Sequence, residues 1–239
     1  MKTISILAYH KIGEPSIKEW QTWNYVSVEN FEKHLDYLLR NEYSVIDAKT
    51  FLAGLENTDL IPPKAVLITF DDGYKSMYDT MLPVLKKFSF PAVLFIPTAY
   101  VGNYNVFDAD LQYEPKESMC KWDELRELEN NKVSIQSHGV FHRHFSDLSP
   151  EELDMEISVS KAEIEKEIKK PVQIFSFPYG DDGQNKLRTM ELLEKAGYSC
   201  AMLYGGGAAK PTIISRFKLP RIAVGSDTDL EAEMKRHLV

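Results

Sequence analysis

The chain has 239 residues, a net charge of -8 and an isoelectric point near 5.3. This acidic balance argues against nucleic acid and anionic membranes as partners, because nothing in the sequence offers the positive charge that neutralises phosphates. The hydrophobic fraction of 44% and the charged fraction of 27% are typical of a globular protein with a sizeable core. No apolar run approaches the roughly 18 residues of a membrane-spanning helix.

We find no internal repeat, low-complexity segment or linker, and therefore expect one domain over residues 1–239. The apolar stretch 4–8 is shorter than a signal-peptide core of roughly 7–15 residues and is better explained as a buried strand. Cys120 and Cys200 are too few for a disulfide framework and are expected to be free thiols. Both observations predict a cytoplasmic protein in a reducing compartment.

Short apolar runs recur along the chain and predict eight strands. Several are continuous β-branched or aliphatic runs, which is typical of parallel strands buried on both faces. The predicted strands cover residues 4–9, 44–46, 65–70, 92–96, 133–136, 174–177, 199–203 and 221–224.

Helical patterns lie between these strands, and the first two precede the middle of the chain. Ser27 is placed to cap a helix whose apolar face carries Phe31, Leu35, Leu38 and Leu39. A second helix is predicted over residues 77–88, directly after the strand 65–70 and its loop.

Two more helices are predicted in the second half of the chain. One begins at Ser149, with Pro150 at its first position and a capping box, and it ends before Pro171. The other runs from about residue 184 to residue 195, with Gly197 as its left-handed stop.

Repeated strand–helix units predict a parallel sheet with right-handed crossovers. Eight such strands favour an α/β fold in the form of an irregular (β/α) barrel, whose active site would lie at the carboxyl ends of the strands. Two long connections, 11–26 and 97–120, follow strands and would lie on that same side. Connections of this length often bind substrate or cover a site.

The strongest functional signal is a pair of segments that could share one metal ion. Asp71 and Asp72 end the strand 65–70, and His138 and His142 follow the strand 133–136. Two imidazoles and one carboxylate are a common ligand set for a divalent metal that keeps a position open for water. The second carboxylate is then available as a base, so the combination predicts a hydrolase.

Each half of this pattern has an ordinary structural explanation when it is taken alone. Acidic pairs before Gly are frequent in turns, and the chain has a second pair at residues 181–183. We interpret that second pair as turn and helix-cap residues, because a helical pattern follows it. The coincidence of both pairs at predicted strand ends favours the metal site at Asp71, Asp72, His138 and His142.

The segments resemble the motifs of the polysaccharide deacetylases of the NodB-homology type, carbohydrate esterase family four. Residues 69–73, Thr-Phe-Asp-Asp-Gly, match the first motif of that family in full. Residues 138–142, His-Gly-Val-Phe-His, resemble the second motif, although Gly139 replaces its hydroxyl residue. Residues 177–180, Phe-Pro-Tyr-Gly, resemble the third. The resemblance spans roughly residues 4 to 225 and implies a distorted (β/α) barrel of seven to eight parallel strands.

The resemblance also implies roles for single residues. Asp72, His138 and His142 would bind the metal, with zinc expected and cobalt or nickel as alternatives. Asp71 would be the base that activates a metal-bound water for attack on an acetamide. The backbone N–H of Tyr179 would stabilise the resulting oxyanion. The implied partner is an N-acetylated sugar or glycan.

The chain departs from the family pattern at two functional positions. Ser176 stands where the third motif usually carries Arg, and residues 219–224 lack the late His that usually serves as general acid. His10, at the end of the first predicted strand, resembles the acid of the subgroup that deacetylates β-1,6-linked poly-N-acetylglucosamine. Arg221 is the candidate to orient Asp71. The alternatives are a His10 bound to backbone and an Arg221 in an ordinary ion pair.

Aromatic residues of the long connections are candidates for sugar contacts. They could equally pack their own loops. The substrate-binding candidates are Trp20, Trp23, Tyr100, Tyr104 and, in the third motif, Pro178. Two other functions remain open at this point: a hydrolase of a different small amide on the same barrel, and a catalytically silent glycan-binding relative.

Overall fold

The computed structural model describes residues 3–15, 22–109, 116–209 and 216–237. Seven parallel strands close into a barrel because β1 pairs with both β10 and β5. Around the barrel the strands follow the order β1 (Ile4–Tyr9), β10 (Leu219–Ala223), β9 (Cys200–Gly206), β8 (Ile174–Ser176), β7 (Val133–Ser137), β6 (Ala92–Ile96) and β5 (Ala65–Phe70). An eighth strand, β4 (Ser44–Val45), pairs with the first residues of β5. The predicted fold class is confirmed.

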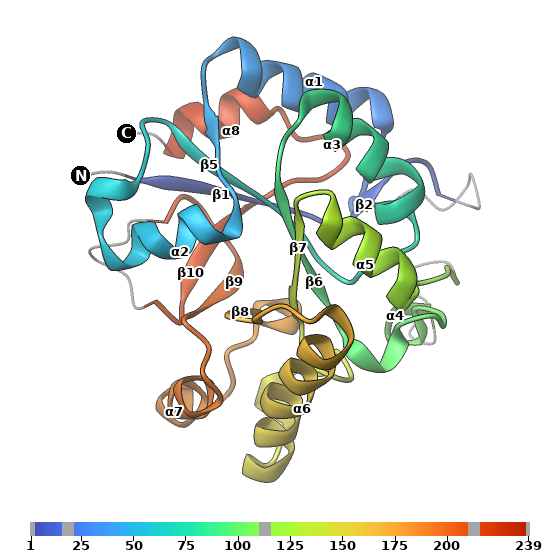
Figure 1. Cartoon of the computed structure of the whole chain (residues 1–239), viewed down its shortest axis with the longest axis vertical. Helices are drawn as coiled ribbons and strands as arrows, with labels where there is room; N and C mark the ends of the chain where they lie inside the picture. Colours follow the sequence, from blue (N-terminus) through green and yellow to red (C-terminus); the bar gives the residue numbers. More distant parts are fainter. Residues whose placement is uncertain (1–2, 16–21, 110–115, 210–215, 238–239) are drawn as a thin grey trace.

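Helices surround the strands, which occupy the centre of the view in Figure 1. They are α1 (Val28–Arg40), α2 (Ala48–Glu56), α3 (Leu82–Phe88), α4 (Val106–Ala109), α5 (Trp122–Asn130), α6 (Pro150–Ile168), α7 (Lys186–Ala196) and α8 (Leu230–His237). A small separate sheet joins β2 (Lys11–Ile12) to β3 (Tyr25–Val26). Among the described helices, none combines the length and the apolar character that crossing a membrane would require.

All eight predicted strands are present, with bounds that differ by up to three residues. The helices α1, α6 and α7 are confirmed, and the predicted helix 77–88 consists of a π-helical turn, Met77–Met81, followed by α3. The assignment of Leu39 to the apolar face of α1 is wrong, because this side chain is 56% exposed. Each residue advances about 100° around a helix, and Leu39 falls outside the stripe that the buried residues define.

Alternate side chains of the strands fill the barrel, as the period of two in a β-strand requires. Ile4 and Ile6 of β1 pack inside against Leu67 of β5 and their counterparts on the other strands. Phe51 of α2 belongs to the same cluster, together with Ile61, which precedes β5. The amino end of the barrel is therefore filled by apolar side chains.

The odd-numbered residues of β1 point outward to the helices. The ring of Tyr9 lies 5.4 Å from Phe31 of α1 and 5.4 Å from Phe70 of β5. Its hydroxyl lies 3.2 Å from Nδ1 of His34, whose Nε2 lies 3.2 Å from the carbonyl oxygen of Thr228. A buried polar chain thus fixes α1 to the first strand and to the segment after β10.

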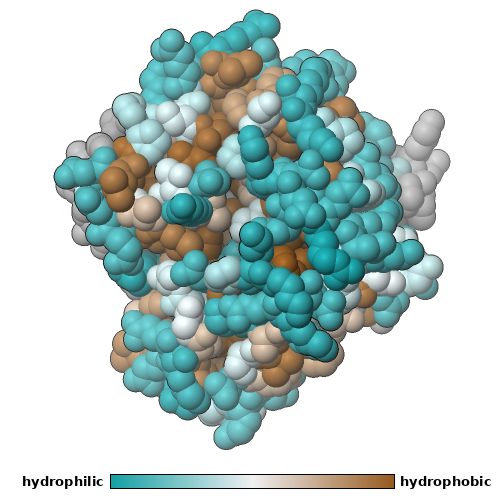
Figure 2. Space-filling model, in the orientation of Figure 1, coloured by the Kyte–Doolittle hydropathy of each residue, from teal (hydrophilic) through white to brown (hydrophobic). Residues whose placement is uncertain are grey.

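The surface is largely polar. Figure 2 shows hydrophilic side chains over most of the face that Figure 1 presents, with hydrophobic side chains in separate patches between them. Cys120 and Cys200 are buried free thiols, as predicted, and burial raises the pKa of both.

Candidate active site

The alternation of the strands brings polar side chains together at the carboxyl end of the barrel. Positions that continue the inward-facing series carry His10 after β1, Asp71 after β5 and His138 after β7. The same series places Ser176 at the end of β8, Tyr204 on β9 and Arg221 on β10. On β1, β5, β8, β9 and β10, apolar residues precede these polar ones along the inward-facing series.

Arg221 is the centre of this polar group and is fully buried. Its guanidinium binds both carboxylate oxygens of Asp71, at 2.8 and 2.7 Å. Its remaining N–H groups donate to Oγ1 of Thr69 at 3.2 Å, to Oγ of Ser176 at 2.9 Å and to the carbonyl of Leu203 at 2.7 Å. All five N–H donors of the side chain are therefore used.

The bidentate pair sets the charge of Asp71. Burial alone would raise the pKa of this carboxyl, but the adjacent Arg221 guanidinium, and secondarily His138, hold it below the usual value. The group is therefore an ionised carboxylate in a fixed orientation. The expectation that Arg221 could orient Asp71 has the geometry that it needs, and Ser176, in place of the family's Arg, accepts one of the guanidinium hydrogen bonds.

Asp72 turns away from the strand and faces the two imidazoles. Its backbone lies in the left-handed region, with φ of 76°, and Gly73 follows with φ of 80°. A Cβ at Gly73 would lie 2.8 Å from Cγ2 of Ile96, so this position requires glycine. Oδ1 of Asp72 lies 3.1 Å from Nε2 of His142 and 3.4 Å from Nε2 of His138.

The three side chains form a buried group whose ligand atoms all lie within 4.8 Å of one another. Among the described residues, Oδ1 of Asp72 and Nδ1 of His142 have no hydrogen-bond partner. Nδ1 of His138 is hydrogen-bonded to the carbonyl of Ser176 at 2.7 Å, which leaves Nε2 directed at Asp72. Two imidazoles, a carboxylate and an unpartnered buried oxygen fit a divalent metal such as zinc.

The charges in this group are interdependent. Burial would raise the pKa of Asp72, but the adjacent imidazoles of His138 and His142 lower it well below the usual value. Burial favours the neutral form of both imidazoles and lowers the pKa of His142. At His138 the nearby carboxylates outweigh burial and raise the pKa. A cation between these groups would replace the proton that the carboxylates attract.

The loop that carries both imidazoles is supported from α6. Glu156, which is fully buried, accepts hydrogen bonds from the backbone N–H of Val140 at 2.5 Å and of Phe141 at 3.0 Å. Gly139 adopts φ of 80°, and a Cβ there would lie 2.7 Å from Oε2 of Glu156. The residue that departs from the family's second motif is thus in contact with a buried carboxylate.

His10 lies on the same rim. Its ring is edge-on to Tyr204, with the centroids 5.1 Å apart. The charge of His10 also lowers the pKa of Asp71 and of Asp72, although burial and closer partners have larger effects on both. Nδ1 of His10 and the hydroxyl of Tyr204 are buried and have no hydrogen-bond partner among the described residues. The alternative of a His10 held by backbone finds no such bond at Nδ1.

Tyr179 forms the other side of the rim. It has φ of 57°, its ring lies 4.6 Å from that of His142, and the ring of His144 stacks on it at 3.9 Å. Asp181 accepts from Ser146 and from the N–H of Gly183, which confirms the predicted turn. The predicted cap function of this second acidic pair is wrong, because α7 is capped by Asn185.

The aromatic candidates differ in their surroundings. Trp20 lies outside the described residues. Trp23 donates from its indole to Asp227 at 2.6 Å and packs against Gly225. Tyr100 donates to the carbonyl of Phe141 at 3.3 Å. Tyr104 is 43% exposed, with Lys116 above its ring, and Pro178 is buried beside Tyr179. Their contact with substrate stays a prediction.

The two long connections are joined by an ion pair between a buried lysine and a partly exposed glutamate. Nζ of Lys11 lies 3.0 Å from Oε2 of Glu117 and above the rings of Tyr74 and Tyr25, at 4.2 and 4.6 Å from their centroids. Tyr25 also donates to Glu117. Phe107, from the same connection as Glu117, places its ring 4.3 Å from His142.

Sequence reasoning missed Tyr204 and Glu156. The predicted strand ended at residue 203, so the next inward-facing position on β9 was not considered. Glu156 lies in the buried stripe of α6 between Leu153 and Ile157, and a carboxylate on an apolar face is a signal that the sequence did contain.

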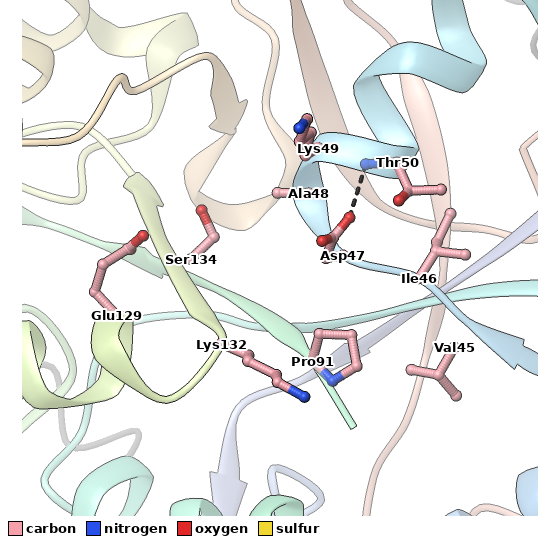
Figure 3. Close-up of a pocket in the computed structure, with 10 residues that line it drawn as sticks. All are labelled: Val45, Ile46, Asp47, Ala48, Lys49, Thr50, Pro91, Glu129, Lys132 and Ser134. Carbon is pink, nitrogen blue, oxygen red and sulfur yellow. Dashed lines mark hydrogen bonds between the residues drawn. The ribbon is translucent and has the colours of Figure 1, made fainter. Parts of the chain in front are cut away.

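A cavity of about 510 Å³ lies near the amino ends of the barrel strands, opposite the polar group described above (Figure 3). Its lining includes Pro91 and Lys132, which directly precede β6 and β7, and Asp47, which caps α2. It is thus separate from the group at the carboxyl ends, where the titratable side chains converge.

Several known proteins are similar to this chain in sequence or in fold. A model of the family described as polysaccharide deacetylase matches residues 60–201, more than half of the chain. The chain is 28% identical over 206 residues to YxkH of Bacillus subtilis, a protein whose name places it among the polysaccharide deacetylases. It is 26% identical over 215 residues to a poly-β-1,6-N-acetyl-D-glucosamine N-deacetylase of Staphylococcus aureus. These matches cover 86% and 89% of the chain but 66% and 71% of the relatives.

The fold is shared with a solved deacetylase. The structure of PplD from Streptococcus pyogenes, in complex with acetate, superposes with a TM-score of 0.84 at 21% identity and covers 100% of this chain and 99% of that one. This likeness shows the fold. The family match covers more than half of the sequence, and by that match the chain belongs to the polysaccharide deacetylase family.

Proposed function

We propose that the protein is a metal-dependent hydrolase that removes N-acetyl groups from an amino sugar or glycan. The observation that carries this proposal is the buried group of Asp72, His138 and His142 beside the ionised pair of Asp71 and Arg221. A metal-ligand set and a separate, oriented carboxylate are the two components of metal-assisted hydrolysis of an unactivated amide.

The side chains would divide the reaction as follows. A divalent ion bound by Asp72, His138 and His142 would supply an activated water molecule and a positive charge near the acetamide oxygen. Asp71, held by Arg221, accepts the proton of the attacking water. The N–H of Tyr179 donates to the acetamide oxygen as it gains charge. The C–N bond then breaks, and a proton donated to nitrogen releases the amine and acetate.

The acid in this scheme is His10. Its ring continues the inward-facing series of β1 and is close enough to Asp71 and Asp72 to affect the pKa of both. The named substrate of the staphylococcal relative supports an N-acetylglucosamine polymer as the substrate class. This chain spans about two thirds of the length of its relatives. The length and linkage of the glycan that it accepts are therefore not inferred from those relatives.

The test is metal analysis followed by an acetate-release assay on N-acetylglucosamine oligomers. We expect one equivalent of metal, acetate release that a chelator abolishes, and recovery when zinc or cobalt is added back. Metal without acetate release from any glycan would favour a different small amide. Absence of both would favour a glycan-binding protein and contradict the proposal.

Variants of the two imidazoles locate the metal. His138→Ala and His142→Ala should each lose bound metal and nearly all acetate release while circular dichroism shows a folded barrel. His237→Ala is a matched control, because His237 lies on α8 and pairs with Glu233. Full metal occupancy in the double variant of His138 and His142 would rule out this assignment.

A further inference from the structure

We propose that Glu156 is a positioning residue that holds His138 and His142 in the arrangement of metal ligands. The inference rests on the proposed function for its purpose, but its contacts lie outside the ligand set.

The contacts of Glu156 are those of a loop anchor. Its carboxylate reaches the backbone between the two imidazoles and accepts from consecutive N–H groups, those of Val140 and Phe141. Val140 and Phe141 are the two residues that separate Gly139 from His142. A carboxylate that binds backbone N–H groups in a buried setting fixes the loop more firmly than a neutral acceptor would.

The loop needs such support because its backbone is strained. His142 has φ of 52°, in the left-handed region that side chains other than Gly rarely occupy, and Gly139 has φ of 80°. A strained conformation persists only where its surroundings hold it. Without the Glu156 acceptor, the N–H of the buried Val140 would lose its partner and the loop would be free to relax.

The helix end of the contact is itself fixed. Oγ of Ser160 donates to the carbonyl of Glu156 at 2.7 Å and lies 2.7 Å from Oγ of Ser137, the last residue of β7. The hydroxyl of Tyr198 donates to the carbonyl of Ile157 at 3.1 Å. Glu156 therefore extends from a helix segment that is attached to the strand preceding His138.

Gly139 and Glu156 lie close together. A Cβ at position 139 would lie 2.7 Å from Oε2 of Glu156, so a side chain there would displace the carboxylate from its present position. The φ of 80° at this residue favours glycine as well.

The first experiment measures amide hydrogen exchange in the metal-free protein. Glu156→Ala should raise exchange in the segment 138–142, whereas Glu163→Ala, which removes an exposed carboxylate from the same helix, should leave it unchanged. Glu156→Gln keeps an acceptor oxygen and should show a smaller increase. Unchanged exchange in Glu156→Ala would overturn the inference whether or not the protein binds metal.

The second experiment measures cobalt affinity by titration, with circular dichroism to confirm folding. Loss of a residue that supports metal ligands typically weakens binding 10–100-fold, and we expect a loss in this range for Glu156→Ala and a smaller one for Glu156→Gln. Affinities of Glu156→Ala and Glu163→Ala that are equal would overturn the inference. Absence of cobalt binding in the wild type would instead refute the proposed function, and the exchange experiment would then decide the role of Glu156.

Discussion

At the scale of single residues, one buried guanidinium orients the proposed base. Arg221 connects β10 to Asp71 after β5 and to Ser176 at the end of β8, and Ser176 in turn accepts from His138 through its carbonyl. Ser176 therefore contacts both the residue that orients the proposed base and one of the proposed metal ligands. Ser176 has a small side chain and leaves room for Arg221, which extends from β10.

Asp71 should be essential for rate but dispensable for metal binding. Asp71→Asn removes the proton acceptor while Asp72, His138 and His142 remain, so acetate release should fall by about 10²- to 10⁴-fold with the metal retained. The measurement is turnover and metal content side by side, with Asp36→Asn on the exposed face of α1 as the control. If Asp71→Asn loses metal and Asp72→Asn keeps it, the two carboxylates have the opposite roles.

His10 should matter most where the leaving group is poor. His10→Ala removes the proposed proton donor, so release of acetate from an N-acetyl sugar should drop strongly with the metal and the fold unchanged. An aryl acetate needs little help in leaving, because its phenolate is stable, and its hydrolysis should drop much less. Equal losses on both substrates, or none, would remove His10 from the mechanism and direct attention to His144.

At the scale of elements, α1 is attached to the barrel through a neutral histidine. Burial lowers the pKa of His34, although its bond to Thr228 and the charge of Asp229 oppose this. The unfolded chain, with an ordinary histidine pKa near 6.5, takes up a proton at a higher pH than the folded chain does. The free energy of unfolding should therefore fall as the pH drops below about 6.5, toward the lower pKa of the folded state.

The pH dependence can be assigned by substitution. His34→Gln keeps a donor for the Thr228 carbonyl but does not titrate, so its stability should change less between pH 7 and pH 5 than that of the wild type. Urea unfolding at several pH values measures this, and His237→Gln is the control because it leaves the Tyr9 and Thr228 contacts intact. Identical slopes in His34→Gln and the wild type would show that the docking of α1 does not depend on this proton.

The elements that the sequence predicted are those with a strong physical signature. Strands buried on both faces appear as continuous apolar runs, and α6 begins with a capping box whose two hydrogen bonds are both present. α5 was missed because it is short and largely charged, with Leu125 and Leu128 as its buried residues. α2 was missed because Phe51 packs against the apolar cluster inside the barrel, and this long-range contact leaves no pattern in the local sequence.

The site was predictable to the extent that strand ends define it. Asp71 and His138 follow predicted strands, so the barrel rule alone brings them together. The support of the backbone at Val140 and Phe141 by Glu156 was not predictable in this way, because it depends on how α6 packs against β7. The left-handed backbone of Asp72, which directs the two adjacent carboxylates to different partners, is likewise a property of the folded turn.

At the scale of the whole molecule, the barrel has an apolar half and a polar half, and metal binding should couple to its stability. A ligand that binds only the folded state at 100 times its dissociation constant stabilises by about 2.7 kcal/mol. For a chain of this size that corresponds to a rise in melting temperature of roughly 5–10 °C. Thermal unfolding with and without zinc measures it, and the double variant of His138 and His142 to Ala should show no rise. An equal rise in that variant would place the metal elsewhere.

The ion pair of Lys11 and Glu117 has a consequence for how a substrate is received. Lys11 is buried, Glu117 is partly exposed, and Tyr25 donates to the same carboxylate, so the two connections that the pair joins resist separation. Phe107, which belongs to one of these connections and packs on His142, is then already in place before a ligand arrives. The conformational entropy of this segment has already been lost during folding. A sugar chain that binds beside it would therefore not lose affinity by having to order the segment.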